Sequence, residues 1–447
     1  MNIIIVGAGE VGYHLAERLS KDNDIVCIDE NTDKIRRISE NLDVKVICSS
    51  GSSPTTLQEA DIQSADMLIA VTDKDEINMV ACLFANILSP ETIKIARIRG
   101  SEFIRYKEIF SHDFLNIHLI LNPELEAVKT ILKLLEVPGA LDVVDFAGGM
   151  IKLIGIKVYP TCPISGARLK DLEKKALNHE ILIAAIMRNN QLVIPSGEDK
   201  VMTGDLIYIV SKGNKISQAL ALFGEKGEPI SKVLIVGGGK IGGILASELE
   251  KRDIQTKIIE KKQARCDYLA EKLEKTVVLE GDGTDQTLLK EENIQDMDFV
   301  IAVTNHEDQN VLISLLARNL GAKRTLTLID KTSYLPLVSA IGLDITVSPA
   351  LSAISALLRY FRKEKVLSNM VLKGEYAEVI EIVATEDSDV VKKPLRNLEF
   401  PKGAIIGAMV RNENVIIPSG KSMIMPGDRI IIFSSTEALP KVEKFWA

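Results

Sequence analysis

The sequence predicts an α/β protein with two doubly wound parallel-sheet domains of the Rossmann-like type, each followed by a small α+β domain. Three observations support this prediction: short apolar runs alternate with helical patterns, a glycine-rich turn occurs twice, and a smaller segment follows each copy in the same order. Hydrophobic residues make up 46% of the 447 residues, but aromatic residues only 4%. The core must therefore consist mainly of Ile, Val, Leu and Ala, as in buried parallel sheets.

The repeat appears in three pairs of similar segments. The turn VGAGEVG at 6–12 matches VGGGKIG at 236–242. The motif IAVT stands in both copies of a second pair of segments, and IPSG stands in both copies of a third. The order of large and small units predicts four domains, at 1–125, 140–224, 231–350 and 368–447. The segment 224–231 contains Gly, Pro and charged residues, and it is expected to link the two halves.

Six apolar runs in the first large domain predict six strands: IIIV, IVCID, VKVIC, MLIAV, IKIARI and HLIL. The helical patterns between them are typical of a doubly wound sheet. Apolar-striped helices are expected at 122–135 and 348–361, where Asn or Ser precedes Pro at the first helical position. Each stripe could pack one unit against another or cover the helix's own sheet. In the small domain a helical segment is expected at 170–177.

The first glycine-rich turn indicates a nucleotide site. Gly7 allows a tight turn after the first strand, Gly9 lets the backbone approach a pyrophosphate, and Gly12 permits close packing of the next helix, whose N-terminus attracts anions. Asp29, 22 residues after Gly7, ends the second strand and can accept hydrogen bonds from ribose hydroxyls. Its charge repels a 2′-phosphate, which favours NAD(H), ATP or ADP over NADP(H). The alternative is a turn kept only for packing.

The second copy has the same features with different surroundings. Gly237, Gly239 and Gly242 form the turn, and Glu260 takes the place of the ribose-binding carboxylate. The residues Lys261 and Lys262 follow it and weaken the exclusion of NADP(H).

Polar residues follow the fourth strand of each copy. Thr72 and Asp73, and Thr304 and Asn305, come at the carboxyl ends of these strands, where open α/β sheets bind ligands. They could contact a ligand or simply act as helix N-caps.

Two arginines, Arg97 and Arg99, alternate on the fifth strand and so share a face. Burying both is costly unless they meet anions, either a phosphate or the carboxylates of a neighbouring subunit. We align Ile329 of TLTLIDK with Arg97, so the second copy lacks this arginine.

The ends of the third strands also differ. We align Gly51 with Gly281, which places Ser52 opposite Asp282 and removes that carboxylate from the first site. We therefore expect two unequal nucleotide sites.

Composition excludes several other classes of protein. The formal net charge of −8 argues against general nucleic-acid binding. No apolar run reaches the length of a membrane span, and the N-terminus lacks the pattern of a signal peptide. The five cysteines are scattered without paired spacing, so no metal site is expected.

The motifs GAGEVG, IAVTDKDEINMVAC, KIARIR and Asn122-Pro123-Glu124, together with the two IPSG-bearing small units, resemble the TrkA family of Trk-system potassium uptake proteins. The large units are similar to RCK N-terminal domains and the small units to RCK C-terminal domains. The resemblance covers nearly the whole chain. It implies a cytoplasmic regulatory subunit, not an enzyme, that lies on an integral-membrane potassium-translocating partner at the inner membrane, assembles as a ring of RCK domains and binds NAD(H) or ATP/ADP.

The residues and the resemblance together give two sets of candidate nucleotide-binding residues. The first set is Gly7, Ala8, Gly9, Glu10, Val11, Gly12, Asp29, Thr72, Asp73, Arg97 and Arg99. The second set is Gly237, Gly238, Gly239, Lys240, Ile241, Gly242, Glu260, Asp282, Thr304 and Asn305.

Two other functions remain possible from the sequence. An NAD-dependent oxidoreductase would need a substrate domain and a proton donor near the nicotinamide, and the small units offer no obvious His, Lys or Tyr for that role. A nucleotide-sensing regulator could instead serve another partner, such as an antiporter or a transcription factor, although no basic helix-turn-helix segment is visible.

Overall fold

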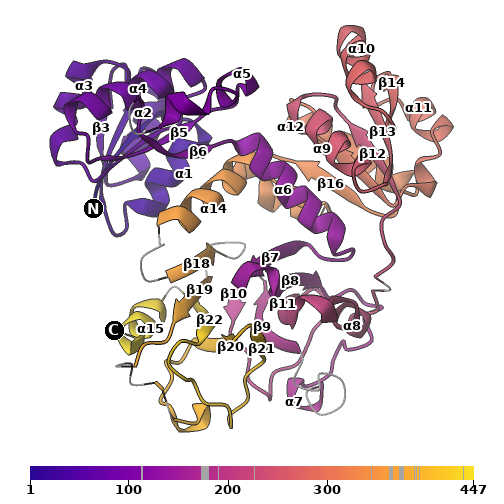
Figure 1. The fold of residues 1–447 in the computed structure, drawn as a ribbon. Coiled ribbons are helices and arrows are strands. Elements are labelled where there is room, and N and C mark those ends of the chain that lie inside the picture. Colours follow the sequence, from indigo (N-terminus) through magenta and orange to yellow (C-terminus); the bar gives the residue numbers. More distant parts are fainter. Residues whose placement is uncertain are drawn as a thin grey trace.

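The structure is a computed structural model that describes residues 1–111, 114–172, 181–189, 191–225, 227–343, 345–361, 366–371, 377–386, 388, 390–391, 393–435 and 437–446. Two large domains lie side by side above two small ones, and two long helices cross between them (Figure 1).

The first large domain is a six-stranded parallel sheet with strand order β3-β2-β1-β4-β5-β6. Its strands are β1 (Asn2–Val6), β2 (Asp24–Asp29), β3 (Lys45–Cys48), β4 (Met67–Ala70), β5 (Ile93–Arg97) and β6 (Ile117–Leu121). Its helices are α1 (Glu10–Leu19), α2 (Thr32–Asn41), α3 (Pro54–Glu59), α4 (Asp75–Leu88) and α5 (Ser101–Ile104). The order reverses between β1 and β4, as in the Rossmann fold, and this confirms the predicted doubly wound sheet.

The second large domain repeats this topology with order β14-β13-β12-β15-β16-β17. Its strands are β12 (Lys232–Val236), β13 (Gln255–Glu260), β14 (Val277–Glu280), β15 (Phe299–Ala302), β16 (Thr325–Leu328) and β17 (Thr346–Val347). Its helices are α9 (Lys240–Glu250), α10 (Gln263–Lys272), α11 (Gln286–Glu291), α12 (Glu307–Asn319) and α13 (Leu335–Ala340).

The small domains are built on five-stranded antiparallel sheets, ordered β10-β9-β11-β8-β7 and β18-β19-β22-β20-β21. The first has β7 (Asp142–Phe146), β8 (Ile151–Lys157), β9 (Ile181–Arg188), β10 (Gln191–Val193), β11 (Leu206–Lys212), α7 (Leu169–Leu172) and α8 (Ile216–Leu222). The second has β18 (Val366–Val371), β19 (Ala377–Val383), β20 (Ala404–Arg411), β21 (Asn414–Ile416), β22 (Arg429–Ser435) and α15 (Leu439–Trp446). The predicted helical segment 170–177 lies outside the described residues from 173 onward.

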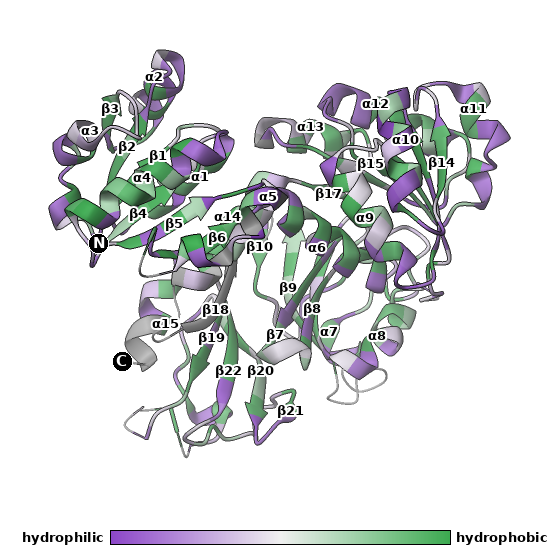
Figure 2. Cartoon of the chain, turned by 45° about the horizontal axis from the view of Figure 1, so that its top comes forward, coloured by the Kyte–Doolittle hydropathy of each residue, from purple (hydrophilic) through white to green (hydrophobic). Residues whose placement is uncertain are grey.

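The two small sheets share one hydrophobic core. Tyr208 and Val210 of the first pack with Val410 and Phe433 of the second in a single buried cluster. Gly407 makes room for the Phe433 ring of its own sheet, since a Cβ there would lie 2.4 Å from that ring, and it would lie 3.3 Å from Val210 of the first sheet. Apolar residues cover the strands and the inner faces of the helices, as Figure 2 shows.

The two crossing helices are α6 (Pro123–Glu136) and α14 (Pro349–Phe361), and each completes the core of the opposite half. Helix α14, from the second half, buries Ala353 and Leu357 in the core of the first large domain. Helix α6, from the first half, buries Ile131 in a core that contains the second large domain. The predicted N-cap is present, because the Asn122 side chain accepts from the Leu125 N–H at 3.0 Å. The apolar stripes therefore join the two halves to each other.

Within the part of the chain that the structure describes, no helix combines the length and the apolarity needed to cross a membrane.

Candidate functional site

The first glycine-rich turn lies between β1 and α1, at the carboxyl edge of the sheet. Gly7 has φ +107°, and a Cβ there would lie 2.8 Å from the Thr72 N atom. At Gly12 a Cβ would lie 1.8 Å from the Gly7 carbonyl oxygen. At Gly9, by contrast, a Cβ would meet nothing within 4 Å. Packing thus requires Gly7 and Gly12, whereas Gly9 borders open space where a ligand can approach.

The N-terminus of α1 faces this space. Gly9 is the N-cap and offers no side-chain cap, and the first intrahelical bond runs from the Tyr13 N–H to the Gly9 carbonyl at 2.8 Å. The N–H groups of the first turn therefore have no intrahelical partners, and the helix dipole favours an anion beside them.

A cleft of about 300 Å³ opens over this turn. It brings together residues from the ends of β1, β2, β4 and β5 and from the start of α1. The lining residues are Val6, Gly7, Gly9, Glu10, Val11, Ile28, Asp29, Glu30, Asn31, Lys34, Ser50, Gly51, Val71, Thr72, Asp73, Lys74, Ile77 and Arg97.

Asp29 lies in this cleft and also organises it. Its carboxylate accepts from the Ala8 N–H at 2.7 Å and from the Asn31 N–H at 2.8 Å. Lys34 is 3.8 Å from the same carboxylate. A carboxylate held in this way keeps lone pairs that can accept from ribose hydroxyls.

Thr72 and Asp73 line the cleft but are not helix N-caps, because α4 begins two residues later with Lys74 as its N-cap. The Thr72 hydroxyl donates to the Asn78 Oδ1 atom at 2.7 Å. Asn78 is fully buried, and its amide also donates to the Arg97 carbonyl at 2.8 Å. It thus joins the ends of β4 and β5.

Asn78 and its counterpart Asn310 were not predicted from the sequence. Asn310 makes the same bonds, to Thr304 at 2.7 Å and to the Leu328 carbonyl at 3.1 Å. The available signal was an Asn at the same place in both copies, on the buried face of a helix.

The structure separates the two arginines of the fifth strand. Arg97 lines the cleft, and its Nε atom is buried without a hydrogen-bond partner among the described residues. Arg99 is not among the residues that line the cleft; it lies 3.8 Å from Asp75 and 3.7 Å from Glu124, and it donates to the Asp73 carbonyl. Carboxylates of the same chain therefore meet Arg99, and Arg97 is the arginine that can meet a phosphate.

The charges around Arg97 come from both halves of the chain. Burial, followed by repulsion from Arg99, lowers the pKa of the Arg97 guanidinium. Two carboxylates oppose this shift electrostatically: Glu124, in the first half, and Asp330, in the second half.

The second turn has the same backbone geometry. Gly237 has φ +112°, and a Cβ at Gly242 would lie 1.9 Å from the Gly237 carbonyl oxygen. Glu260 accepts from the Gly238 N–H at 2.7 Å and from the Lys262 N–H at 2.9 Å, as Asp29 does in the first site. Helix α9 begins at Lys240 with Gly239 as an N-cap that offers no side-chain cap, and Ile241 is buried in its first turn.

The predicted pairing of Gly51 with Gly281 is wrong by two residues. The Ser49 N–H donates to the Asp29 carbonyl and the Gly281 N–H to the Glu260 carbonyl, so Ser49 matches Gly281. The glycine equivalent to Gly51 is Gly283. At both, a Cβ would lie 2.1 Å from a valine Cγ1 atom.

Ser50, and not Ser52, therefore stands where the second copy has Asp282. The first site still lacks this carboxylate. Asp282 is 2.9 Å from the Lys261 Nζ atom and accepts from the Thr284 N–H, and these bonds lower its pKa to about 2.

The predicted pairing of Arg97 with Ile329 is wrong by one residue. Ala96 pairs with the fourth strand at Ala70 and Thr327 pairs at Ala302, so the next residues, Arg97 and Leu328, are equivalent. Ile329 is buried and matches Ile98. The second copy has no arginine at this position.

The two sites also differ in charge at the start of the helix. Glu10 of the first site pairs with Arg37 at 2.7 Å and lies 3.6 Å from His14, and hydrogen bonding to His14 is the main reason why its pKa falls to about 2. Lys240 stands at the same position in the second site.

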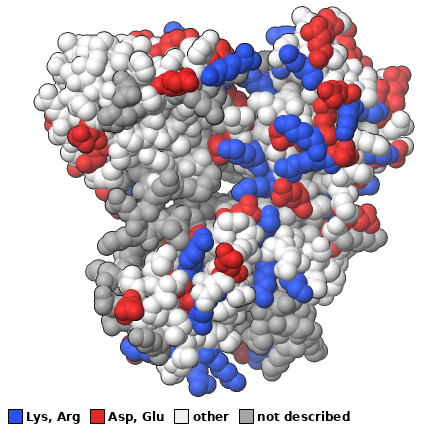
Figure 3. All heavy atoms as spheres, in the orientation of Figure 1, with Lys and Arg blue, Asp and Glu red and all other residues white. Residues whose placement is uncertain are grey.

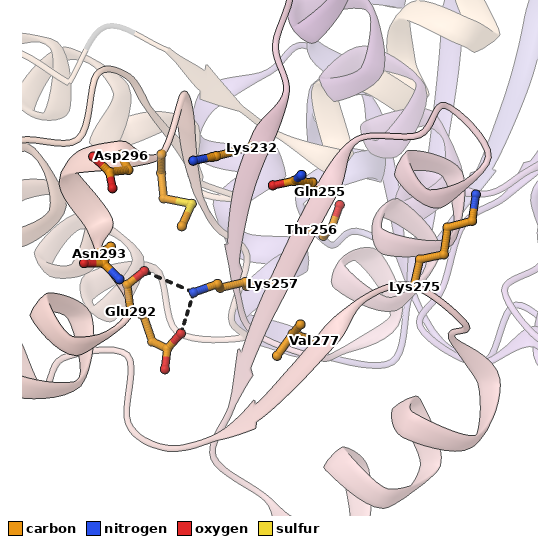
Figure 4. A pocket seen from close by; sticks show the side chains of 10 residues that line it. Lys232, Gln255, Thr256, Lys257, Lys275, Val277, Glu292, Asn293 and Asp296 are labelled. Atoms are coloured by element: carbon orange, nitrogen blue, oxygen red, sulfur yellow. Dashed lines mark hydrogen bonds and ion pairs between the residues drawn. The ribbon is translucent and has the colours of Figure 1, made fainter.

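A second cavity of about 300 Å³ lies at the opposite, amino edge of the second sheet (Figure 4). Its lining includes Lys232, Lys257 and Lys275, and Lys257 is held by Glu292 at 2.7 Å. Open α/β sheets bind ligands at their carboxyl ends, so this cavity is not our candidate site. On the face shown in Figure 3, basic and acidic side chains are interspersed over the second large domain.

Among the described residues, no group of three or more His, Cys, Asp or Glu side chains is arranged to hold a metal ion.

Comparisons with known proteins match both halves of the chain. The TrkA-N domain family matches residues 3–123 and 233–349, and the TrkA-C domain family matches residues 153–224 and 379–446. The Trk system potassium uptake protein TrkA of Halomonas elongata is 38% identical over 97% of this chain and 95% of its own. The Trk system potassium uptake protein TrkA homolog 2 of Methanosarcina mazei is 37% identical over the full length of both chains.

Solved structures share the fold at lower sequence identity. The GsuK RCK domain has a TM-score of 0.61 at 19% identity and covers 99% of this chain and 94% of its own. A GsuK channel bound to NAD also has a TM-score of 0.61, at 18% identity, and covers 99% of this chain and 78% of its own. Both confirm the predicted tandem RCK fold.

Proposed function

Because this chain belongs to the TrkA family of Trk-system potassium uptake proteins, we propose that it is a nucleotide-binding regulatory subunit that gates an integral-membrane potassium-translocating partner. The observation that supports this most is the duplicated turn: two glycine-rich turns, each with a carboxylate bonded to its backbone, stand at the carboxyl edges of two linked sheets. Nothing in a dehydrogenase requires such a pair.

The residues of the first site fit NAD(H), ATP or ADP. The N–H groups at the start of α1 would hold phosphate oxygens beside Gly9, and Asp29 would accept from ribose hydroxyls. Arg97 would add a cation for a phosphate. Thr72 and Asp73 would border the ligand at the end of β4. In the second site the corresponding groups are the turn around Gly239, the Glu260 carboxylate and the residues Thr304 and Asn305.

Gating follows from the way in which the halves interlock. A ligand shifts a two-state assembly only by its different affinity for the two states. Helix α14 packs on the first large domain beside Ala8 and Val11, so a change at that turn is transmitted to the second half. Nucleotides that place different charge near Arg97 would therefore favour different arrangements.

The proposed assembly is a ring of RCK domains at the inner face of the membrane, held there by the potassium-translocating partner. The relatives named for potassium uptake and the RCK fold of the GsuK channel support this part of the proposal.

The main alternative is an NAD-dependent oxidoreductase. If NADH absorbance appeared when the protein was incubated with NAD⁺ and a panel of alcohols, the regulatory proposal would have to be abandoned. A regulator of another membrane partner would be recognised by co-purification with that partner.

Potassium uptake measured in cells that lack their own regulatory subunit tests the proposal. We expect the wild-type chain, produced with its membrane partner, to restore uptake. The variants Asp29→Ala and Glu260→Ala should bind the membrane partner normally but lose the response of potassium uptake to nucleotide. Each variant should bind nucleotide roughly tenfold more weakly at its own site, because hydrogen bonds to a charged group are lost. Unchanged nucleotide responses in both variants would contradict the proposal.

A further inference from the structure

The residues that follow the ribose-binding carboxylate differ in charge between the two sites. In the first site, residues 30–34 contain Glu30, Asp33 and Lys34. In the second site, residues 261–265 contain three basic residues and no acidic one: Lys261, Lys262 and Arg265. The equivalence is structural, because helices α2 and α10 begin at Thr32 and Gln263.

Arg265 is bound directly to the second glycine-rich turn. Its Nε atom donates to the Gly238 carbonyl at 2.5 Å and its Nη2 atom to the Gly239 carbonyl at 3.1 Å. The Gly238 N–H donates to Glu260, so the guanidinium and the ribose-binding carboxylate bind the C=O and the N–H of the same residue. Lys34, its counterpart in the first site, lies 3.8 Å from Asp29, and no bond between it and the turn carbonyls is present.

The surroundings keep the guanidinium in this place. It stacks on the Tyr268 ring, with 4.6 Å between the guanidinium carbon and the ring centroid. At Gly243, a Cβ would lie 3.1 Å from the Arg265 Nη2 atom, whereas the first site has Tyr13 at this position. Two carbonyl partners leave the positive charge of Arg265 uncompensated, and planar, multidentate binding of phosphate is the chemistry that arginine favours.

We propose that the second site takes an adenine nucleotide with an additional phosphate on the adenosine ribose, and that Arg265 is the residue that binds this phosphate. The first site excludes such ligands, because Asp29 is followed there by Glu30 and a single basic residue. Lys262 is exposed and adds a second cation near the same place. This inference rests on the proposed nucleotide-binding function and assigns different ligand classes to the two sites.

Calorimetric titration of the full-length protein with NAD⁺ and with NADP⁺ tests the inference. We expect the wild-type chain to bind NADP⁺ at one site per chain, and Arg265→Gln to weaken NADP⁺ binding about tenfold or more while NAD⁺ affinity changes less than threefold. Arg265→Lys keeps a cation and should recover part of the NADP⁺ affinity, which a merely structural role for Arg265 would not predict.

The matched control is Lys34→Gln in the first site, which should leave NADP⁺ binding unchanged. Equal losses of NAD⁺ and NADP⁺ affinity in Arg265→Gln, in a protein that melts at the wild-type temperature, would overturn the inference. So would a wild-type chain that binds NAD⁺ but not NADP⁺, although the proposed function would survive that result. If neither dinucleotide nor ADP bound to the wild-type chain, the proposed function itself would fail.

Discussion

At the scale of single residues, the protonation of His14 makes the stability of the protein around the first turn depend on pH. It is buried on α1, with its Nδ1 atom 2.8 Å from Glu17 and its Nε2 atom 3.6 Å from Glu10. Burial opposes the charged form, but hydrogen bonds to both carboxylates outweigh it, so the pKa of His14 is raised. The stability that His14 contributes is therefore complete below pH 6.5, and it is lost as the pH rises through its raised pKa.

We predict that His14→Gln lowers the melting temperature more at pH 6 than at pH 9. Glu10, with a pKa of about 2, stays ionised at both values and does not add its own pH dependence. Thermal melts of wild type and variant at the two pH values measure the difference. A gap between the two proteins that stayed constant or widened toward pH 9 would show that His14 is not charged in the fold.

Sequence reasoning placed the glycines in the two turns and Asp29 and Glu260 at the ends of their strands, as the structure has them, because tight turns and strand ends leave clear residue signatures. It misplaced the counterparts of Arg97 and Asp282, because the two copies differ in length between the first and third strands and between the fourth and fifth strands. The correct pairs of equivalent residues follow only from the structure. The register of the sheet at Ala96 and Thr327 gives one pair, and the packing of Gly51 and Gly283 gives the other. The repeated Asn was a signal for Asn78, but its bonds to Thr72 and Arg97 depend on how the ends of β4 and β5 meet, which the sequence pattern does not give.

At the scale of elements, the turn between β1 and α1 serves both packing and ligand binding. Gly12 is needed for packing, and Gly9 borders the space for a ligand. We predict that Gly12→Ala destabilises the protein by about 3 kcal/mol or more, because its Cβ would overlap the Gly7 carbonyl oxygen. Gly9→Ala should change stability by about 1 kcal/mol or less, since its backbone is extended and its Cβ meets nothing.

Gly9→Ala should nevertheless weaken nucleotide binding, because the added methyl group lies in the space that the phosphates would occupy. Chemical denaturation and calorimetry on the same two proteins separate the effects. A Gly9→Ala variant that bound nucleotide as tightly as wild type would argue against a ligand at this turn.

The crossing helices show what an element's sequence leaves undecided. The apolar stripes of 122–135 and 348–361 predicted two helices and their N-caps correctly. The apolar stripe of a helix shows that one face is buried, but it does not show which surface that face packs against. The exchange of α6 and α14 between the halves could therefore not be predicted, because it depends on tertiary packing.

At the scale of the whole molecule, this exchange makes the halves interdependent. Leu357, on α14, is fully buried in the core of the first large domain. We predict that Leu357→Ala costs about 2 to 5 kcal/mol and lowers hydrogen-exchange protection of β1, more than 300 residues away in the sequence. Leu337→Ala, at a leucine that is 64% exposed, is the control and should have little effect. Loss of protection confined to the second large domain would contradict the interlocked packing.

We propose that one chain carries two unequal nucleotide sites. This is tested by calorimetric titration of the wild-type protein with ADP, beside the variants Asp29→Ala and Glu260→Ala. We predict two binding events of different affinity in the wild-type chain, with one event weakened roughly tenfold in Asp29→Ala and the other weakened roughly tenfold in Glu260→Ala. A wild-type chain that bound no ADP, or variants that both kept two unchanged events, would contradict it.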